Sequence, residues 1–507
     1  MLFHTPAFIL GFLPVCVAGF FLAGQVAGRT AALGWLIAAN LFFYGWWNPA
    51  FTLLLLGSVA GNYLLGQRIR CLALAARGSE DPAPFSRSGD LHRGTEAPAR
   101  AARLWLIAAI AANLLLLAWF KYADFLLSIV APDQPALGIF LPLAISFFTF
   151  QQIMYLVDCH RAPESAAGPL SYAAFVTFFP HLIAGPLVAP REIIPQFRHL
   201  SSPVPHNLSV GLSLFLLGLG KKLVLADTIG GFADVGFDAA GRGETLSFFE
   251  AWYATLAYAL QIYFDFSGYS DMAIGLARMF NIRFPLNFNS PYQARSISDF
   301  WRRWHITLGL FLRDYVFIPL GGSRHGMPRT LAALMVTMLL GGLWHGAAWR
   351  FVVWGGLHGV FLAVHAAWRR IGPPLPGVLA RGLTLLAVVL AWVPFRAADL
   401  PTAWHMTRSL AGLNGIALPQ MIISAVPALG AIATPVPVLP FLGDARTLSF
   451  PEVTACLLLG WIIVLALPHL HLWRPPARAW GLTAGFALTV QALFFAPNVA
   501  PFLYFQF

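Results

Sequence analysis

The stretch PLNFNSPYQARSISDFWRRWHITLGLFLRDYVFIPLGG, residues 285–322, decides how the rest of the chain is interpreted. Together with GGLWHGAAW, residues 341–349, it brings charged and ionisable side chains into or beside apolar surroundings. These side chains are Asp299, Arg302, Arg303, His305, Arg313, Asp314 and His345. Because such groups cost about 2.5 to 3.5 kcal/mol each near the centre of a bilayer, they tend to be paired, water-lined or functional. We therefore expect the functional site in these two segments.

The composition of the whole chain is that of an integral membrane protein. Of its 507 residues, 58% are hydrophobic and 10% are charged, and the mean hydropathy is +0.70, whereas soluble proteins carry roughly 25% charged residues. The net charge of +11 comes from basic residues scattered through short loops, which indicates membrane topology and argues against a nucleic-acid partner. We expect an all-α polytopic fold of about 11 to 14 transmembrane or part-spanning helices, in a single domain over residues 1–507.

An arginine-rich insert at residues 67–103 sets the expected orientation. By the positive-inside rule this insert is cytoplasmic, and its polar composition predicts a solvated, partly disordered loop. Three apolar runs precede it, at residues 4–28, 31–47 and 50–66, so the N-terminus is expected outside. No basic residue precedes the first run, which favours a retained span over a cleaved signal peptide. Later apolar runs include residues 329–343, 347–366 and 378–395.

Residues 147–162 and 178–192 form a polar island in this apolar chain. Pro180, Gly185 and nearby prolines interrupt helix periodicity, so the second segment is expected to be re-entrant or irregular and packed within protein. His181 lies in that break. It could line a cavity, or it could anchor the break structurally.

Further polar groups occur where the chain is otherwise apolar. Lys221 and Lys222 are interpreted as lysines that snorkel to the interface. Asp265 and Asp271 are six residues apart, so they would not share one helix face, and we expect arginines from other helices as their partners. Residue 272 is Met where a nucleophile elbow needs Gly, which argues against a serine hydrolase. The sequence has no HExxH motif and no clustered cysteines, so no metal is expected.

The WRRWHITL segment is predicted to be one helix. Ser298 or Asp299 could cap its N-terminus, and Asp299 and Asp314 could pair the arginines. Helical spacing would then form a single face from Trp301, His305, Leu308 and Leu312. Small residues around His345 would allow a second helix or a ligand to approach closely. Taken alone, either histidine could be purely structural.

Five strings resemble the membrane-bound O-acyltransferase family, over about residues 140 to 360. They are PLNFNSPYQARSISDFWRRWHITL, FLRDYVFIPLGG, LQIYFDFSGYSDMAIG, FFPHLIAGP and LWHGAAW. The resemblance is strongest to the bacterial branch that contains the alginate O-acetyltransferase membrane component and the D-alanyl transfer protein of teichoic acid. It implies a many-helix bundle around a central channel, with His345 as the principal catalytic histidine and His305 at the second characteristic polar position. The candidate channel residues are Trp301, Trp304, Asp299, Arg302, Arg303, Trp344, Asp265 and His181.

The residues fit acyl transfer chemically. A thioester is already activated, so transfer to a sugar hydroxyl mainly requires a base and a means of bringing the two substrates together. Burial lowers a histidine pKa and favours the neutral, basic form near pH 7. We expect His345 to be this base, with His305 orienting it or polarising the thioester carbonyl. Since neither histidine adjoins a Ser or Cys elbow, direct transfer is favoured over an acyl-enzyme, although a relay to a partner protein stays open.

The resemblance also implies substrates and partners. No bound cofactor is expected; the donor would be cytoplasmic acetyl-CoA or another acyl thioester, and the final acceptor an exported polysaccharide such as alginate. Periplasmic acetyltransferases and the lipid of a bacterial inner membrane would be its partners. D-alanyl transfer to teichoic acid, or acetylation of peptidoglycan or cellulose, are alternatives within the family. A transporter or flippase, in which the histidines relay protons, is the alternative of another class.

Overall fold

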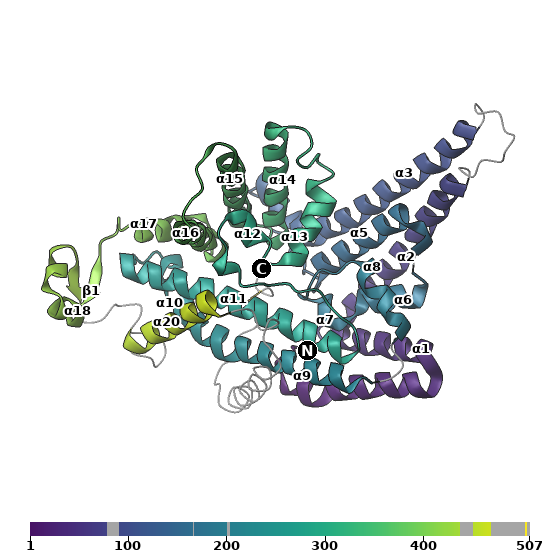
Figure 1. Cartoon of the computed structure of the whole chain (residues 1–507), viewed down its shortest axis with the longest axis horizontal. Helices are drawn as coiled ribbons and strands as arrows, with labels where there is room; N and C mark the ends of the chain where they lie inside the picture. The colour runs from purple at the N-terminus through teal and green to yellow at the C-terminus, as the bar shows by residue number, and fades with distance from the viewer. Residues whose placement is uncertain (79–90, 166, 200–202, 437–449, 468–501, 504–507) are drawn as a thin grey trace. The chain divides into compact units, whose positions relative to one another are not determined.

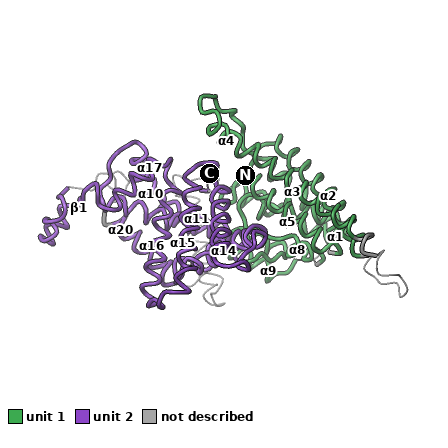
Figure 2. Tube along the Cα trace, turned by 90° about the horizontal axis from the view of Figure 1, so that it is seen from above, with its two compact units in different colours: residues 1–215, 272–285 green, residues 216–271, 286–507 purple. Residues whose placement is uncertain are grey.

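The computed structural model describes residues 1–78, 91–165, 167–199, 203–436, 450–467 and 502–503. In these ranges the regular structure is helical apart from two three-residue strands, so the predicted all-α class is confirmed. The chain divides into two compact units (Figure 2). Unit 1 comprises residues 1–215 and 272–285, and unit 2 comprises residues 216–271 and 286–507. The single domain expected from the sequence stays a prediction.

Unit 1 contains the N-terminal helices (Figure 1). They are α1 (Leu13–Gly45), α2 (Pro49–Gly78), α3 (Leu91–Leu117), α4 (Ala123–Val130), α5 (Ile145–Arg161), α6 (Pro169–Thr177), α7 (Phe179–Leu182) and α8 (Pro190–Ile193). A π-helical turn, Ala7–Phe12, leads into α1. The short helices α7 and α8 confirm the irregular segment predicted at residues 178–192 from the prolines around His181, because each begins with proline in its first turn.

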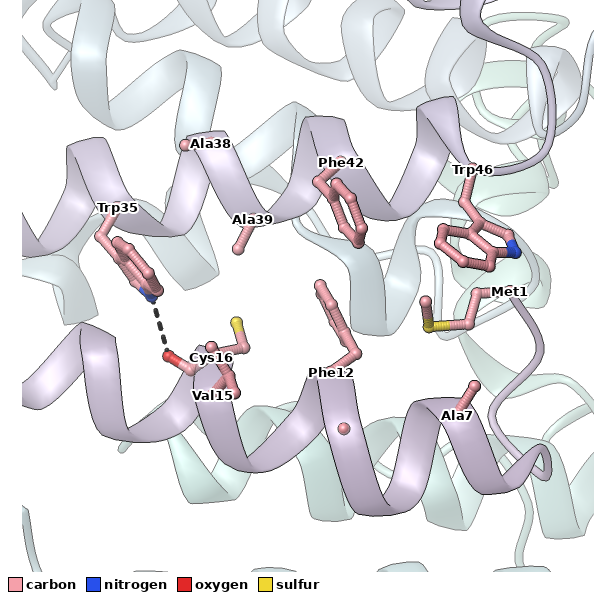
Figure 3. Close-up of a pocket in the computed structure, with 11 residues that line it drawn as sticks. Met1, Ala7, Phe12, Val15, Cys16, Trp35, Ala38, Ala39, Phe42 and Trp46 are labelled. Carbon is pink, nitrogen blue, oxygen red and sulfur yellow. Dashed lines mark hydrogen bonds between the residues drawn. The ribbon is translucent and has the colours of Figure 1, made fainter.

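Helix α1 is folded into two legs at Gly28. This residue has φ 78° and ψ −173°, a conformation that is open to glycine and strained for other residues. The legs correspond to the separate apolar runs predicted at residues 4–28 and 31–47. They lie side by side, and the indole nitrogen of Trp35 donates to the carbonyl oxygen of Cys16 at 3.0 Å (Figure 3). Between them is an apolar cavity of about 540 Å³ that contains none of the predicted site residues.

Part of the predicted loop at residues 67–103 is helical, so that prediction is wrong for its described part. Helix α2 continues to Gly78, α3 begins at Leu91, and residues 79–90 lie outside the described ranges. The alanine and arginine of this stretch are good helix formers. One local pair adds support, because Arg100 contacts Glu96 one turn earlier at 3.1 Å. The end of α2 is also paired with a distant residue, since Arg77 contacts Glu164 at 2.8 Å.

Unit 2 contains the remaining helices and a small sheet. Its helices are α10 (Asp227–Gly241), α12 (Ile297–Trp301), α13 (Ile306–Leu312), α14 (Met327–His345), α15 (Trp349–Ile371), α16 (Gly377–Arg396), α17 (Leu400–Leu410), α18 (Gln420–Ala425) and α20 (Phe450–Ala466). It also holds the end of α9 (Pro205–Gly220) and most of α11 (Phe248–Met279), the other parts of which belong to unit 1. Strands β1 (Ala417–Pro419) and β2 (Thr434–Val436) pair in parallel, with Ala417 opposite Thr434.

Seven helices in the described ranges are long and apolar enough to cross a membrane. They include α14, α15 and α16, which confirm the runs predicted at residues 329–343, 347–366 and 378–395. Helices α14 and α15 lie side by side in Figure 1 and pack extensively against each other. A Cβ added at Gly342 of α14 would lie 2.2 Å from the carbonyl oxygen of Phe351, so only glycine permits this approach. The total of 11 to 14 spans stays a prediction.

Candidate active site

The WRRWHITL segment is not one helix, so the predicted single face of Trp301, His305, Leu308 and Leu312 is wrong. Helix α12 ends at Trp301, and α13 begins at Ile306. His305 lies between them in the left-handed region, with φ 42° and ψ 55°. The predicted caps are also wrong, because the side chain of Ser296 accepts from the backbone N–H of Asp299 at 3.1 Å. Ser296 has the extended backbone typical of an N-cap residue.

His305 is buried, with 1% of its surface exposed. Its Nδ1 lies 3.2 Å from the side-chain oxygen of Asn287. The rings of Phe266 and His305 form a T-shaped pair with a centroid distance of 4.7 Å, and the Trp344 ring centroid lies 6.3 Å from that of His305. Among the described residues, Nε2 has no hydrogen-bond partner. His305 lies outside the seven candidate spans, and burial lowers its pKa to about 3, so it is neutral near pH 7.

His345 ends helix α14 inside an aromatic enclosure. Its ring centroid lies 5.0 Å from Trp344, 5.0 Å from Trp354 and 5.2 Å from Phe395. Only 7% of the residue is exposed. The close helix approach predicted from the small residues near it is confirmed by the packing of α15 against α14. The Trp344 ring centroid lies 6.3 Å from that of His305 and 5.0 Å from that of His345, so the two predicted catalytic histidines lie beside one indole in unit 2.

The two tryptophans of the WRRWHITL segment belong to the same aromatic cluster. Trp304 packs against Trp392 at 5.0 Å. Trp301 donates its indole N–H to Nδ1 of His358 at 3.3 Å. His358 is fully buried in α15 and lies 4.8 Å from Trp354, which also contacts His345. His358 was not among the site residues predicted from the sequence, where its position as a histidine within the apolar run at residues 347–366 is the signal that could have found it.

The charged candidates of this segment lie in more open surroundings than the histidines. Arg303 pairs with Asp299 at 2.9 Å, and their side chains are 32% and 28% exposed. Arg302 is exposed and donates to the hydroxyl of Ser298 at 3.2 Å. The predicted pairing of arginines with local acids is confirmed here and for Arg313 with Asp314, at 2.6 Å. Exposed ion pairs of this kind contribute at most about 1 kcal/mol to stability, so they add little to the stability of this segment.

Asp265 lies in a separate buried cluster of charges in unit 2. Lys222 contacts Asp265 at 2.6 Å and Asp227 at 2.7 Å, and Lys221 contacts Asp271 at 2.6 Å. The predictions of arginine partners and of snorkelling lysines are therefore wrong. Carboxylates on α11 and at the start of α10 supply counter-ions within the protein, so the ammonium groups have no need to reach water.

His181 belongs to unit 1 and is fully buried there. Its Nε2 lies 2.8 Å from the carbonyl oxygen of Phe175, and its ring stacks on Phe284 at 5.2 Å. These contacts are those of a residue that anchors the break between α6 and α7. Its role in a substrate channel stays a prediction. Across the described ranges, no three His, Cys, Asp or Glu side chains gather as metal ligands do.

Comparison with known proteins connects this geometry to a family. The sequence model of the membrane-bound O-acyltransferase family matches residues 148–376, a range that includes His181, His305 and His345. A peptidoglycan O-acetyltransferase of Helicobacter pylori is 39% identical, over 100% of this chain and 98% of that protein. The chain belongs to the membrane-bound O-acyltransferase family.

Other members of the family are also similar to the chain. A probable alginate O-acetylase of Pseudomonas aeruginosa is 39% identical, over 81% of this chain and 75% of that protein. A teichoic acid D-alanyltransferase of Bacillus subtilis is 26% identical, over 56% of this chain and 74% of that protein. The protein is thus a multi-pass membrane O-acyltransferase, as its sequence motifs predicted.

Proposed function

We propose that this O-acyltransferase takes an acetyl group from a cytoplasmic thioester such as acetyl-CoA and delivers it across a bacterial inner membrane to an exported polysaccharide. The observation that carries the proposal is the pair of buried histidines, His305 and His345, whose rings both lie beside that of Trp344. An imidazole buried among aromatic rings suits a reaction that needs a general base.

In the proposed reaction His345 is the general base. It accepts the proton of the attacking hydroxyl while the hydroxyl oxygen bonds to the acyl carbon. The carbon–sulfur bond then breaks, and the proton passes to the leaving thiolate, so the enzyme returns to its starting state. His305 either orients His345 or polarises the thioester carbonyl. If the family's periplasmic acetyltransferases serve as partners, the first acceptor is one of their hydroxyls and the polysaccharide receives the acetyl group from them.

The names of the relatives support two acceptors. Alginate O-acetylases align with about four-fifths of the chain, and this was the acceptor expected from the sequence. The peptidoglycan O-acetyltransferase of Helicobacter pylori aligns with all of it at the same 39% identity, which favours peptidoglycan as the second candidate. D-alanyl transfer to teichoic acid has weaker support, because that relative is 26% identical over 56% of the chain.

Mass spectrometry of the cell envelope in a deletion strain tests the acceptor. Loss of O-acetyl groups from exopolysaccharide or from peptidoglycan, restored by the wild-type gene, would identify it. The same strain carrying His345→Ala should remain unacetylated although the protein reaches the membrane in normal amount. His405→Ala is the matched control, because His405 is an exposed histidine of α17. Acetylation by the His345→Ala variant at the wild-type level would refute the assignment of the base.

A vesicle assay distinguishes acyl transfer from solute transport. Membrane vesicles supplied with labelled acetyl-CoA should accumulate covalently bound label on an acceptor. Movement of intact solute without covalent transfer would instead support the transporter interpretation. A reporter fused to the N-terminus tests its orientation, and we expect the signal of a location outside the cytoplasm.

A further inference from the structure

We propose that Asn287 is a positioning residue of the acyl transfer reaction, which holds the proton of His305 on Nδ1 and leaves Nε2 as a hydrogen-bond acceptor. This inference rests on the proposed function only in its account of what His305 does. The assignment of the proton itself follows from the contacts around Asn287.

The orientation of the Asn287 amide is fixed by its other neighbours. The backbone N–H of Thr307 lies 3.3 Å from Oδ1 of Asn287, and the Thr307 hydroxyl lies 3.0 Å from the same atom. A backbone N–H can only donate, so the atom that faces it must be the carbonyl oxygen. On the opposite side, Nδ2 donates to the hydroxyl of Ser270 at 3.0 Å. If the amide were flipped, Nδ2 of Asn287 would face the backbone N–H of Thr307, and two donors would oppose each other.

This orientation determines the tautomer of His305. Nδ1 of His305 lies 3.2 Å from the same Oδ1, which can only accept. Nδ1 must therefore carry the proton. In a neutral imidazole the other nitrogen then has the lone pair, and the hydrogen bond of one ring nitrogen sets the role of the other. Nε2 is buried and has no hydrogen-bond partner among the described residues, so its lone pair is available.

The backbone holds both residues in this arrangement. The carbonyl oxygen of Asn287 accepts from the N–H of Ile306 at 2.9 Å, directly after His305. His305 has a left-handed conformation, which costs about 1 kcal/mol or more for a residue with a side chain. Asn287 is fully buried, and Ser270 anchors it to α11, the helix that also presents Phe266 to the His305 ring. A strained histidine held from both backbone and side chain is a common feature of functional sites.

The tautomer narrows the role of His305. A neutral His305 with its proton on Nδ1 cannot donate through Nε2 to a thioester carbonyl. It can accept a hydrogen bond from the attacking hydroxyl or from a ring N–H of His345. The tautomer therefore favours a His305 that orients His345 by accepting a hydrogen bond, and argues against a His305 that polarises the thioester carbonyl by donating one.

Nuclear magnetic resonance of the wild-type protein tests the tautomer without any change in the fold. The full chain, labelled with ¹³C and ¹⁵N in its histidines and reconstituted in lipid, is measured near pH 7, and His305→Gln assigns the His305 signals by their loss. Correlation of each ring nitrogen with Cγ or Cδ2 shows which nitrogen carries the proton. We expect the proton on Nδ1. A proton on Nε2 of His305 would overturn the proposal whatever the catalytic result.

Variants of Asn287 test the effect on the reaction. Asn287→Ala removes the acceptor, and we expect kcat to fall about 10²-fold or more with a nearly unchanged KM for acetyl-CoA, because general acid–base contributions are of this size. Asn287→Asp keeps an acceptor oxygen towards Nδ1 and should recover part of that loss. Asn113→Ala is the matched control, since it removes another buried asparagine amide, which is paired with Asn62 in unit 1.

The outcomes separate this inference from the proposed function. Full kcat in Asn287→Ala, or equal losses in the Asp and Ala variants, would show that Asn287 does not position His305 for the reaction. If the proton lies on Nδ1 and Asn287→Ala is impaired while His345→Ala stays active, the positioning role stands and the assignment of His345 as the base fails.

Discussion

Removal of the Lys222 ammonium should be one of the most destabilising single changes in unit 2. The Lys222 side chain is 3% exposed and contacts two carboxylates, on Asp265 at 2.6 Å and on Asp227 at 2.7 Å. The side chains of those carboxylates are only 1% and 10% exposed. Lys222→Met fills a similar volume but leaves both of them without this counter-ion. Breaking a buried ion pair in this way costs about 3 to 5 kcal/mol.

The exposed pair between Asp299 and Arg303 provides the comparison. Its side chains are 28% and 32% exposed, so Arg303→Met should cost less than about 1 kcal/mol. Unfolding of the purified protein in mixed detergent micelles, followed by circular dichroism, measures both free energies. The triple variant Lys222→Met, Asp265→Asn and Asp227→Asn should recover most of the lost stability, because no buried charge is left unpaired. If Lys222→Met cost no more than Arg303→Met, the reasoning from burial would be refuted.

Two further predictions concern the histidine sites. Gly342→Ala should reduce both activity and stability, because the added Cβ would lie 2.2 Å from a carbonyl oxygen of α15. Gly356→Ala should be tolerated, because its added Cβ would have its nearest contact at 3.6 Å. Acetyl transfer and unfolding measure the two effects, and equal losses in both variants would contradict the packing argument. Burial lowers the pKa of His305 to about 3, below its ordinary value near 6.5, so below pH 6.5 the unfolded state takes up a proton that the folded state does not. The contribution of His305 to the free energy of unfolding should thus be complete above pH 6.5 and be lost towards pH 3. Between pH 7 and pH 5 the free energy of unfolding should therefore decrease less in His305→Gln than in the wild type. An equal decrease in both proteins would show that His305 is not desolvated.

The fold class could be predicted from the sequence because it depends on composition and on the length of apolar runs. The runs that became α14, α15 and α16 are uninterrupted and end at recognisable breaks, such as Gly346 and the prolines at 373 and 374. Gly28 and Arg29 likewise separate the two legs of α1. The helical parts of the 67–103 insert were missed because polar composition was taken to indicate a loop, whereas alanine and arginine also favour helix.

The site could be predicted only in part. His305 and His345 were identified by motif, but the surroundings of His305 depend on a contact with a residue 18 positions earlier in the sequence. Helical periodicity placed His305 on a continuous face because no glycine or proline marks the break between α12 and α13. The break is made by Asn287, whose backbone and side chain together bind Ile306, Thr307 and His305.

The partners of the buried lysines were missed for a similar reason. A lysine after an apolar run gives the same local pattern whether it reaches water or a buried carboxylate. Which of these two environments the lysines have depends on Asp265 and Asp271, which lie more than 40 residues later on α11. That one helix carries both carboxylates and also Phe266 and Ser270, which contact His305 and Asn287. The charge cluster and the histidine site are therefore built on successive turns of α11, so a loss of the Lys222 contacts should be transmitted to His305 through a shift of this helix. An activity loss in Lys222→Met that the charge-neutral triple variant restores would demonstrate this connection.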